Sequence, residues 1–330
     1  MNDLNKLTQK LKRVESKYKL ETPSDLVNQY TEDKLYAKEN PLLFGLPKID
    51  EPLDGDLRGK VIAILGLAGS KKSLMAAQCC NINASVHQAR GVASNMEMDN
   101  TNFLGRLIDY ALEPYQSMDA SIKESASRYH KRTLTRKNQE DQNEFLKEKL
   151  SQFYGDNLVV NGTCGMTIAD YRLLLDACIE QYGSVDILMV DGMSATGEDG
   201  SETERYSKVS MGLKSLAKEY KILITVICHL SKTAGGQAIT EYTRDSRQWV
   251  RGSQKIIDDL DICICMSQIE DLETGDPRKD KGYVFMHDKR GTGAIVRVIY
   301  DFFPLNLKLE ESTDDHSMYD TEEKKTHYNK

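Results

Sequence analysis

The sequence contains no long hydrophobic stretch. Its 330 residues include no run of about 18 apolar residues, and the amino-terminal segment is rich in lysine without an apolar core. A helix that spans a bilayer needs about 20 apolar residues, and a secretory signal peptide needs an apolar core of about 7 to 15. The sequence therefore predicts neither a membrane span nor a signal peptide. It indicates a protein of the cytoplasm, or of the host cytoplasm if the source is viral.

The chain also lacks paired cysteines and a net positive charge, and each of these absences excludes a class of protein. The seven cysteines form no C-x-x-C pair, which is the spacing typical of zinc ligands and redox motifs, and most of them lie in apolar runs. Reduced thiols are therefore expected. The net charge of −7 argues against a protein that coats nucleic acid through its overall field. Any contact with DNA must come from a local patch.

One short segment carries a chemical motif. The apolar run 61–65 predicts a buried strand, which gives way to the sequence Gly-Leu-Ala-Gly-Ser-Lys-Lys-Ser at 66–73 and then to a predicted helix. This order is the context of the phosphate-binding motif G-x-x-x-x-G-K-S/T, whose backbone N–H groups and helix N-terminus face an anion. The expected ligand is a nucleoside triphosphate with Mg²⁺. The residues expected to bind it are Gly66, Gly69, Ser70, Lys71, Lys72 and Ser73.

Lys71 is the irregular member of this loop, because it stands where the motif normally has its second glycine. If the position requires a positive φ, a lysine there costs on the order of 1 kcal/mol. Binding of nucleotide is then favoured over fast hydrolysis.

Strands and helices alternate after residue 45. Runs rich in β-branched residues and bounded by Gly, Asn or Asp predict strands at 61–65, 91–95, 157–160, 186–190, 222–228, 261–266, 282–287 and 294–300. Helices are predicted at 73–88, 100–112, 167–182 and 204–220. This alternation predicts an α/β fold with a mainly parallel sheet covered by helices, and the last two strands, joined by a short glycine turn, predict an antiparallel extension.

Three segments are predicted to lie outside that core, which spans 41–309. Residues 1–40 read as a helical arm and linker, in which Leu4, Leu7, Leu11 and Val14 form a stripe that packs either on its own domain or on a neighbouring subunit. Residues 114–150 read as a helical insertion whose basic cluster at 128–137 is either a solvated face or a nucleic-acid surface. The acidic tail 310–330 is predicted to be disordered, and either solubilises the protein or docks a basic partner.

Polar side chains follow three of the predicted strands. Glu97 comes just after the second strand, Asp191 closes the run Ile-Leu-Met-Val, and His229 ends the fifth strand. Ligands of open parallel sheets bind at the carboxyl ends of the strands, beside the phosphate loop. The chemistry of phosphoryl transfer suits Asp191 to Mg²⁺, Glu97 to the attacking water and His229 to the γ-phosphate.

Residues 45–303 resemble the RecA-like core of hexameric replicative DNA helicases, the DnaB family and its phage helicase-primase relatives. The resemblance lies in seven ordered segments: 45–50, 66–73, 95–98 with Arg106, 190–191, 204–219, 228–230, and 251–253 with Asp261 and 289–293 downstream. It implies an ATP hydrolase that assembles as a ring, with Glu97, His229 and Arg290 as catalytic residues. Arg290 would reach the nucleotide of the neighbouring subunit. Asp288 stands where bacterial members have a lysine, and the adjacent Lys289 would take the place of that lysine in binding the nucleotide.

The resemblance also implies partners. Single-stranded DNA would contact the segment 231–254 through Lys232, Arg244, Arg247, Arg251, Gly252 and Ser253. A primase, a polymerase or a loader would meet the acidic tail. Neither a further amino-terminal domain nor a primase domain is expected in this chain.

Two functions remain open at this stage. One is a replicative helicase motor that encircles single-stranded DNA and hydrolyses ATP between subunits. The other is a RecA-like recombination or annealing protein that uses nucleotide as a switch, which Lys71 favours.

Overall fold

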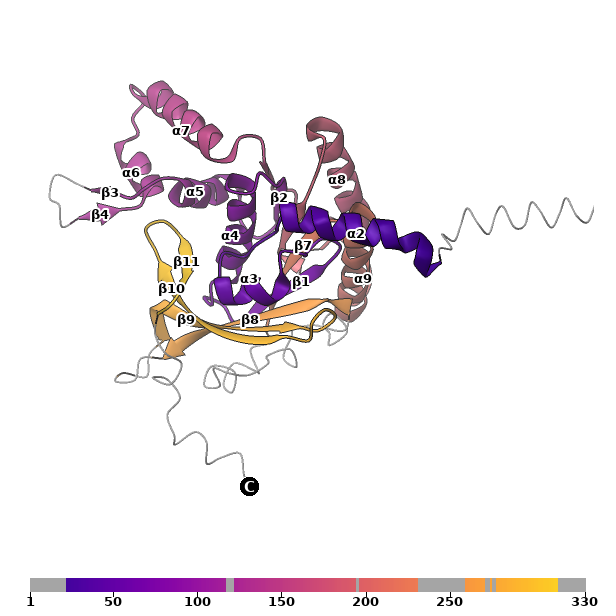
Figure 1. The fold of residues 1–330 in the computed structure, drawn as a ribbon. Helices are drawn as coiled ribbons and strands as arrows, with labels where there is room; N and C mark the ends of the chain where they lie inside the picture. The colour runs from indigo at the N-terminus through magenta and orange to yellow at the C-terminus, as the bar shows by residue number, and fades with distance from the viewer. Residues whose placement is uncertain are drawn as a thin grey trace, which may run out of the picture.

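A large β-sheet forms the centre of the computed structural model, which describes residues 22–116, 122–193, 196–230, 259–270, 274 and 277–313. Within these residues the sheet has nine strands, in the order β11-β10-β9-β8-β1-β7-β6-β2-β5 (Figure 1). The strands are β1 (Val61–Gly66), β2 (Gly91–Asn95), β5 (Leu158–Asn161), β6 (Ile187–Asp191), β7 (Leu223–His229), β8 (Ile262–Glu270), β9 (Pro277–Asp288), β10 (Ile295–Phe303) and β11 (Lys308–Glu311).

Six of these strands, from β8 to β5, are parallel, and β9, β10 and β11 extend the sheet in antiparallel fashion. The helices are α2 (Pro23–Glu39), α3 (Pro47–Leu53), α4 (Lys72–Ser85), α5 (Asn100–Ala111), α6 (Ala126–Thr133), α7 (Gln139–Tyr154), α8 (Ile168–Tyr182) and α9 (Glu202–Tyr220). The predicted fold class, a mainly parallel sheet with an antiparallel extension, is confirmed.

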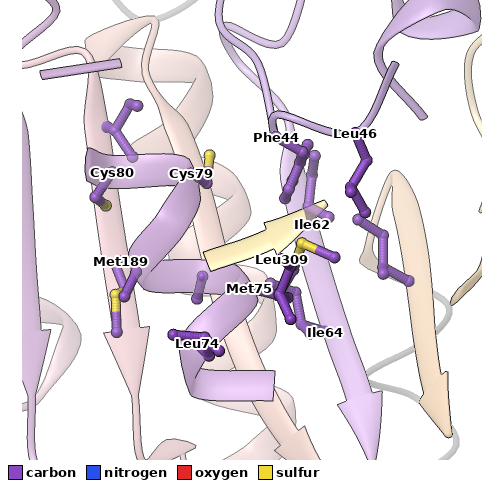
Figure 2. Packing of buried hydrophobic residues seen from close by; sticks show 14 of the residues in the cluster. Phe44, Leu46, Ile62, Ile64, Leu74, Met75, Cys79, Cys80, Met189 and Leu309 are labelled. Carbon is purple, nitrogen blue, oxygen red and sulfur yellow. The ribbon is translucent and has the colours of Figure 1, made fainter. Parts of the chain in front are cut away.

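The sheet is buried on both faces. Along β1, Ile62 and Ile64 pack against α3 and α4, whereas Val61, Ala63 and Leu65 pack against α8 and α9. Figure 2 shows the first of these layers, in which Met75 and Cys79 of α4 lie over the strand. Because successive side chains of a strand point to opposite faces, a continuous apolar run is required where both faces are covered. This is why 61–65 reads as a strand without polar alternation.

The carboxyl-terminal boundary of the core was predicted wrongly. Glu310 and Glu311, assigned to the disordered acidic tail, belong to strand β11, which pairs with β10. Alternating hydrophobicity could not reveal this strand, because it has only four residues and Leu309 is its single buried apolar side chain. Strands β8 and β9 are also longer than predicted, by four and five residues at their adjoining ends. The remainder of the predicted tail, from 314 onward, lies outside the described residues.

Segment 114–150 includes α6, the greater part of α7, and a ribbon that was not predicted, β3 (Tyr115–Gln116) with β4 (Lys123–Glu124). The ring of Tyr115 stacks on that of Tyr129 with centroids 4.1 Å apart. Before the core, α2 begins with a capping box formed by Thr22 and Asp25. The stripe from Leu4 to Val14 lies outside the described residues. Within the part of the chain that is described, every helix is too short or too polar to cross a membrane.

Candidate nucleotide-binding site

The segment 66–73 forms a compact loop between β1 and α4. A side chain at Gly66 would lie 2.3 Å from Ser70 Oγ and 2.6 Å from the Met266 carbonyl oxygen, so this position accepts only glycine. Ser70 turns back on the loop, since its hydroxyl donates to the Leu67 carbonyl at 2.9 Å. The loop thus delivers the chain into the first turn of α4, whose backbone N–H groups have no helical partner. Such a turn is suited to an anion.

Lys71 has a φ of 67°, which confirms that its position is left-handed. Its Nζ lies 4.4 Å from the centre of the Phe302 ring, on β10, in a cation–π contact. Burial lowers the pKa of Lys71, and the nearby charge of Arg106 lowers it further. The lysine that replaces glycine is therefore held by the antiparallel extension of the sheet.

Lys72 is buried, and its Nζ donates to the Leu67 carbonyl oxygen at 2.6 Å. Burial lowers its pKa to about 8, while the carboxylates of Asp191 and Glu97 act in the opposite direction. The amine is consequently still mostly charged at neutral pH. It occupies the loop itself, at the place where the phosphates of a nucleotide would be cradled.

The parallel order of the strands explains why distant residues meet at this loop. In register, Gly66 of β1 pairs with His229 of β7, and Asn95 of β2 pairs with Asp191 of β6. All four positions are the last residues of their strands, so they share the carboxyl edge of the sheet. Glu97 follows β2 at the same edge.

Asp191 has the features of a cation ligand. It is buried, its Oδ1 has no hydrogen-bond partner among the described residues, and Ser73 acts on the charge of its carboxylate. Burial raises the pKa of Asp191, whereas Ser73 and the guanidinium of Arg106 lower it. A buried carboxylate with a free oxygen beside a hydroxyl fits Mg²⁺, which prefers hard oxygen donors and needs few from the protein when phosphates supply the rest.

Glu97 and His229 face each other across the site. Nε2 of His229 lies 3.2 Å from Oε1 of Glu97, and both side chains are 38 % exposed. The hydrogen bond from His229 lowers the pKa of Glu97, against a smaller opposing effect of burial. The carboxylate is thus kept ionised and within reach of solvent, as a base that acts on water must be.

Lys289 and Arg290 do not join these residues. Their backbone N–H groups donate to the Asp261 carbonyl oxygen, just before the amino end of β8, whereas the phosphate loop adjoins Met266, further along the same strand. Five residues of strand separate the two places, or about 17 Å. The unexpected Asp288 is buried and accepts hydrogen bonds from Gly291 N and from Thr292, so it shapes the turn that carries Arg290.

The residues predicted to contact DNA lie outside the described residues: Lys232, Arg244, Arg247, Arg251, Gly252 and Ser253. Conversely, the structure brings to the loop residues that sequence reasoning missed, among them Phe302 and Gln268. Phe302 contacts Lys71, and Gln268 Nε2 donates to the Gly69 carbonyl oxygen at 3.3 Å. Neither has a sequence signal, because Gln268 lies beyond the predicted end of its strand and Phe302 approaches from the opposite end of the chain.

Comparisons with solved structures identify the fold. The ATPase domain of a phage helicase matches with a TM-score of 0.65 and 17 % identity, over 87 % of this chain and 97 % of that one. A DnaB-like replicative helicase, described with its interactions with primase, matches with a TM-score of 0.66 and 18 % identity. The match covers 91 % of this chain and 71 % of that one. A KaiC-like protein from Pyrococcus horikoshii OT3 matches with a TM-score of 0.54 and 12 % identity, over 82 % of this chain and 98 % of that one.

Sequence comparison identifies the family. A search of curated proteins finds no match. The profile of the DnaB-like helicase C-terminal domain matches residues 42–306, which is most of the chain. The predicted RecA-like helicase core is thereby confirmed, and the chain belongs to the DnaB-like helicase C-terminal domain family.

Proposed function

We propose that this protein is the ATP-driven motor of a replicative DNA helicase, which encircles single-stranded DNA and hydrolyses ATP between subunits. The observation that carries this proposal is the division of the site between two edges of the sheet. Lys72, Asp191 and Glu97 gather at one edge, and the turn of Arg290 lies at the other. In this proposal, one chain holds an incomplete site that a second copy completes. Family membership supports a replicative helicase.

The loop residues bind the triphosphate in this proposal. Lys72 exchanges the Leu67 carbonyl for phosphate oxygens, which stabilises its charge in a site where burial disfavours it. Ser73 and Asp191 supply the oxygen ligands for Mg²⁺. When bound, the metal neutralises charge on the β- and γ-phosphates. Gly66, Gly69, Ser70 and Lys71 shape the backbone around the phosphates.

Glu97 positions the attacking water and accepts its proton. Nε2 of His229 lies 3.2 Å from this carboxylate. A γ-phosphate offers His229 an alternative acceptor, so nucleotide binding is expected to release the carboxylate for water. Arg290 of a neighbouring copy then stabilises the charge that develops on the transferred phosphoryl group, with Lys289 beside it.

Further partners follow from the same proposal. A hexameric ring would place segment 231–254 of each copy at the channel, where Lys232, Arg244, Arg247 and Arg251 provide charge and the Gly252 and Ser253 amides provide donors to DNA phosphates. Binding would be tolerant of sequence and weakened by salt. The acidic tail would dock a primase, a polymerase or a loader.

Steady-state ATP hydrolysis with and without single-stranded DNA tests the proposal, together with ATP-dependent strand separation. We expect DNA to stimulate turnover, and Glu97→Gln to abolish both turnover and strand separation while nucleotide still binds. DNA binding without stimulated turnover would instead support a nucleotide-switched recombination or annealing protein, the function that the strained Lys71 favours.

A further inference from the structure

Two buried polar atoms at the carboxyl edge of the sheet have no hydrogen-bond partner within the described part of the chain. One is the donor Nδ2 of Asn95, and the other is the acceptor Oδ1 of Asp191. Asn95 is 1 % exposed and Asp191 is 4 % exposed, so bulk water does not satisfy either atom. Buried polar groups are nearly always paired in folded proteins, and an unpaired one calls for an explanation.

These two atoms belong to neighbouring residues of the sheet. Asn95 and Asp191 are partners in the parallel pairing of β2 with β6. Partners in register project to the same face, on strands about 4.8 Å apart. A free donor and a free acceptor therefore share one small space beside the phosphate loop.

The orientation of the Asn95 amide is determined by its other contact. Its Oδ1 accepts a hydrogen bond from Met98 N at 3.1 Å. A flipped amide would direct its NH₂ group at that N–H, which is also a donor, so Nδ2 is the end left free. The same contact ties Asn95 to the loop that carries Glu97.

We propose that Asn95 is a positioning residue that orients the Asp191 carboxylate through one bridging water. Asn95 Nδ2 donates to the water, and the water donates to Asp191 Oδ1, which satisfies both atoms. A carboxylate has about four lone-pair sites, so Asp191 can accept from this water and still offer oxygen to a cation. Asn95 thus connects the candidate metal ligand with the loop of the candidate base. This inference rests on the proposed function of the site.

The test measures how Mg²⁺ affects nucleotide binding, without relying on turnover. A fluorescent, non-hydrolysable ATP analogue is titrated into the full chain in EDTA and at a series of Mg²⁺ concentrations. Partners that orient metal ligands typically contribute 10- to 100-fold to metal affinity. We expect Asn95→Ala to raise the Mg²⁺ concentration needed for half-maximal enhancement by about tenfold. Affinity in EDTA should stay unchanged.

Two matched variants complete the test. Asn95→Ser retains a group that both accepts and donates, and is expected to restore the Mg²⁺ response. Thr225→Val is the control, because Thr225 is also fully buried with an unpaired hydroxyl but lies beside Met189, away from the carboxyl edge. It should respond like the wild type.

The outcomes separate this inference from the proposed function. If the wild-type chain binds nucleotide without any response to Mg²⁺, the proposed function and the inference both fail. If the wild type responds and Asn95→Ala responds equally, or loses affinity equally in EDTA, the inference alone fails. Should Asn95→Ala not fold, a crystal structure of the wild type decides. A water within hydrogen-bond distance of both atoms supports the inference, and its absence overturns it.

Discussion

Lys71 has a backbone conformation that L-amino acids avoid, and its side chain is nevertheless engaged. The positive φ costs on the order of 1–2 kcal/mol for a residue with a Cβ, and the contact with Phe302 returns roughly 0.5–1 kcal/mol. At the scale of a single residue, the loop therefore balances strain against a contact from a remote strand. A glycine at this position would relieve the strain, but it would also lose the contact with Phe302 of β10.

Two substitutions at Lys71 separate these effects. Lys71→Ala keeps the positive φ and loses the contact with Phe302, whereas Lys71→Gly loses the contact and relieves the strain. After allowance for the greater freedom of glycine in the unfolded chain, Lys71→Gly should be more stable than Lys71→Ala by roughly 0.5–1 kcal/mol. Urea denaturation measures this difference. Equal stability of the two variants would show that the loop is unstrained.

Asp50 provides a prediction of pH dependence. Its carboxylate accepts hydrogen bonds from the N–H groups of Phe44, Gly45 and Leu46, but burial outweighs them and raises its pKa to about 6, from 3.8. The folded state thus binds a proton more tightly than the unfolded state. The contribution of Asp50 to stability is therefore greatest below about pH 4, and it declines as the pH rises to about 6.

The variant Asp50→Asn isolates this effect, because it cannot titrate. A pKa difference of about two units corresponds to about 3 kcal/mol. The free energy of unfolding of the wild type, measured relative to Asp50→Asn, should fall by up to that amount between pH 4 and pH 7. A relative stability that is constant, or that rises with pH, would mean that the three N–H donors outweigh burial.

Among the elements, β11 depends on α4 as well as on its strand partner β10. The buried side chain of Gln78 pairs with both backbone groups of Leu309: its Nε2 donates to the carbonyl at 2.9 Å, and its Oε1 accepts from the N–H at 2.7 Å. An apolar side chain could fill the same space but satisfy neither group. The helix that follows the phosphate loop thereby anchors the last strand of the sheet.

Gln78→Met is expected to destabilise the protein by about 2 kcal/mol or more, since each buried backbone group left without a partner costs about 1–3 kcal/mol. Thermal or denaturant unfolding gives the total loss, and hydrogen exchange at Leu309 locates it. The exposed Gln152→Met, on α7, is the matched control and should change stability little. If the two substitutions have equal effects, Gln78 does not anchor β11.

For the whole molecule, the separation of Arg290 from the phosphate loop supports the proposal that turnover requires an assembly of several copies. Because about 17 Å of strand lies between them, Arg290→Ala should leave nucleotide affinity nearly unchanged and abolish hydrolysis. Arg172→Ala is the control, because Arg172 pairs with Glu219 on the exposed surface of α8 and α9.

Mixing two inactive variants tests this implication directly. In a mixed assembly, a subunit with Arg290→Ala keeps its own Glu97 and can receive Arg290 from a neighbour with Glu97→Gln. Some sites are then complete, so mixing should restore part of the ATPase activity. If the mixture stays as inactive as its components, Arg290 does not act across the interface.

The sequence allowed the prediction of features that depend on neighbours along the chain. Strand β1, the loop 66–73 and helix α4 are contiguous, so apolar runs, glycine positions and the Lys72–Ser73 pair identified the loop. The grouping of Glu97, Asp191 and His229 was also predictable. Because parallel strands end at the same edge of the sheet, the position of a polar residue at the end of its strand is enough to predict that it lies at that edge.

Other features depend on contacts between segments that are remote in sequence, and only the folded arrangement reveals them. Strand β11 pairs with β10 and is anchored by Gln78, about 230 residues earlier, which satisfies both backbone groups of Leu309. Lys71 is held by Phe302, and the free atoms of Asn95 and Asp191 share a space because β2 lies beside β6. Local propensity and periodicity carry no signal for such pairings, because they are determined by which surfaces pack and which buried polar groups find partners.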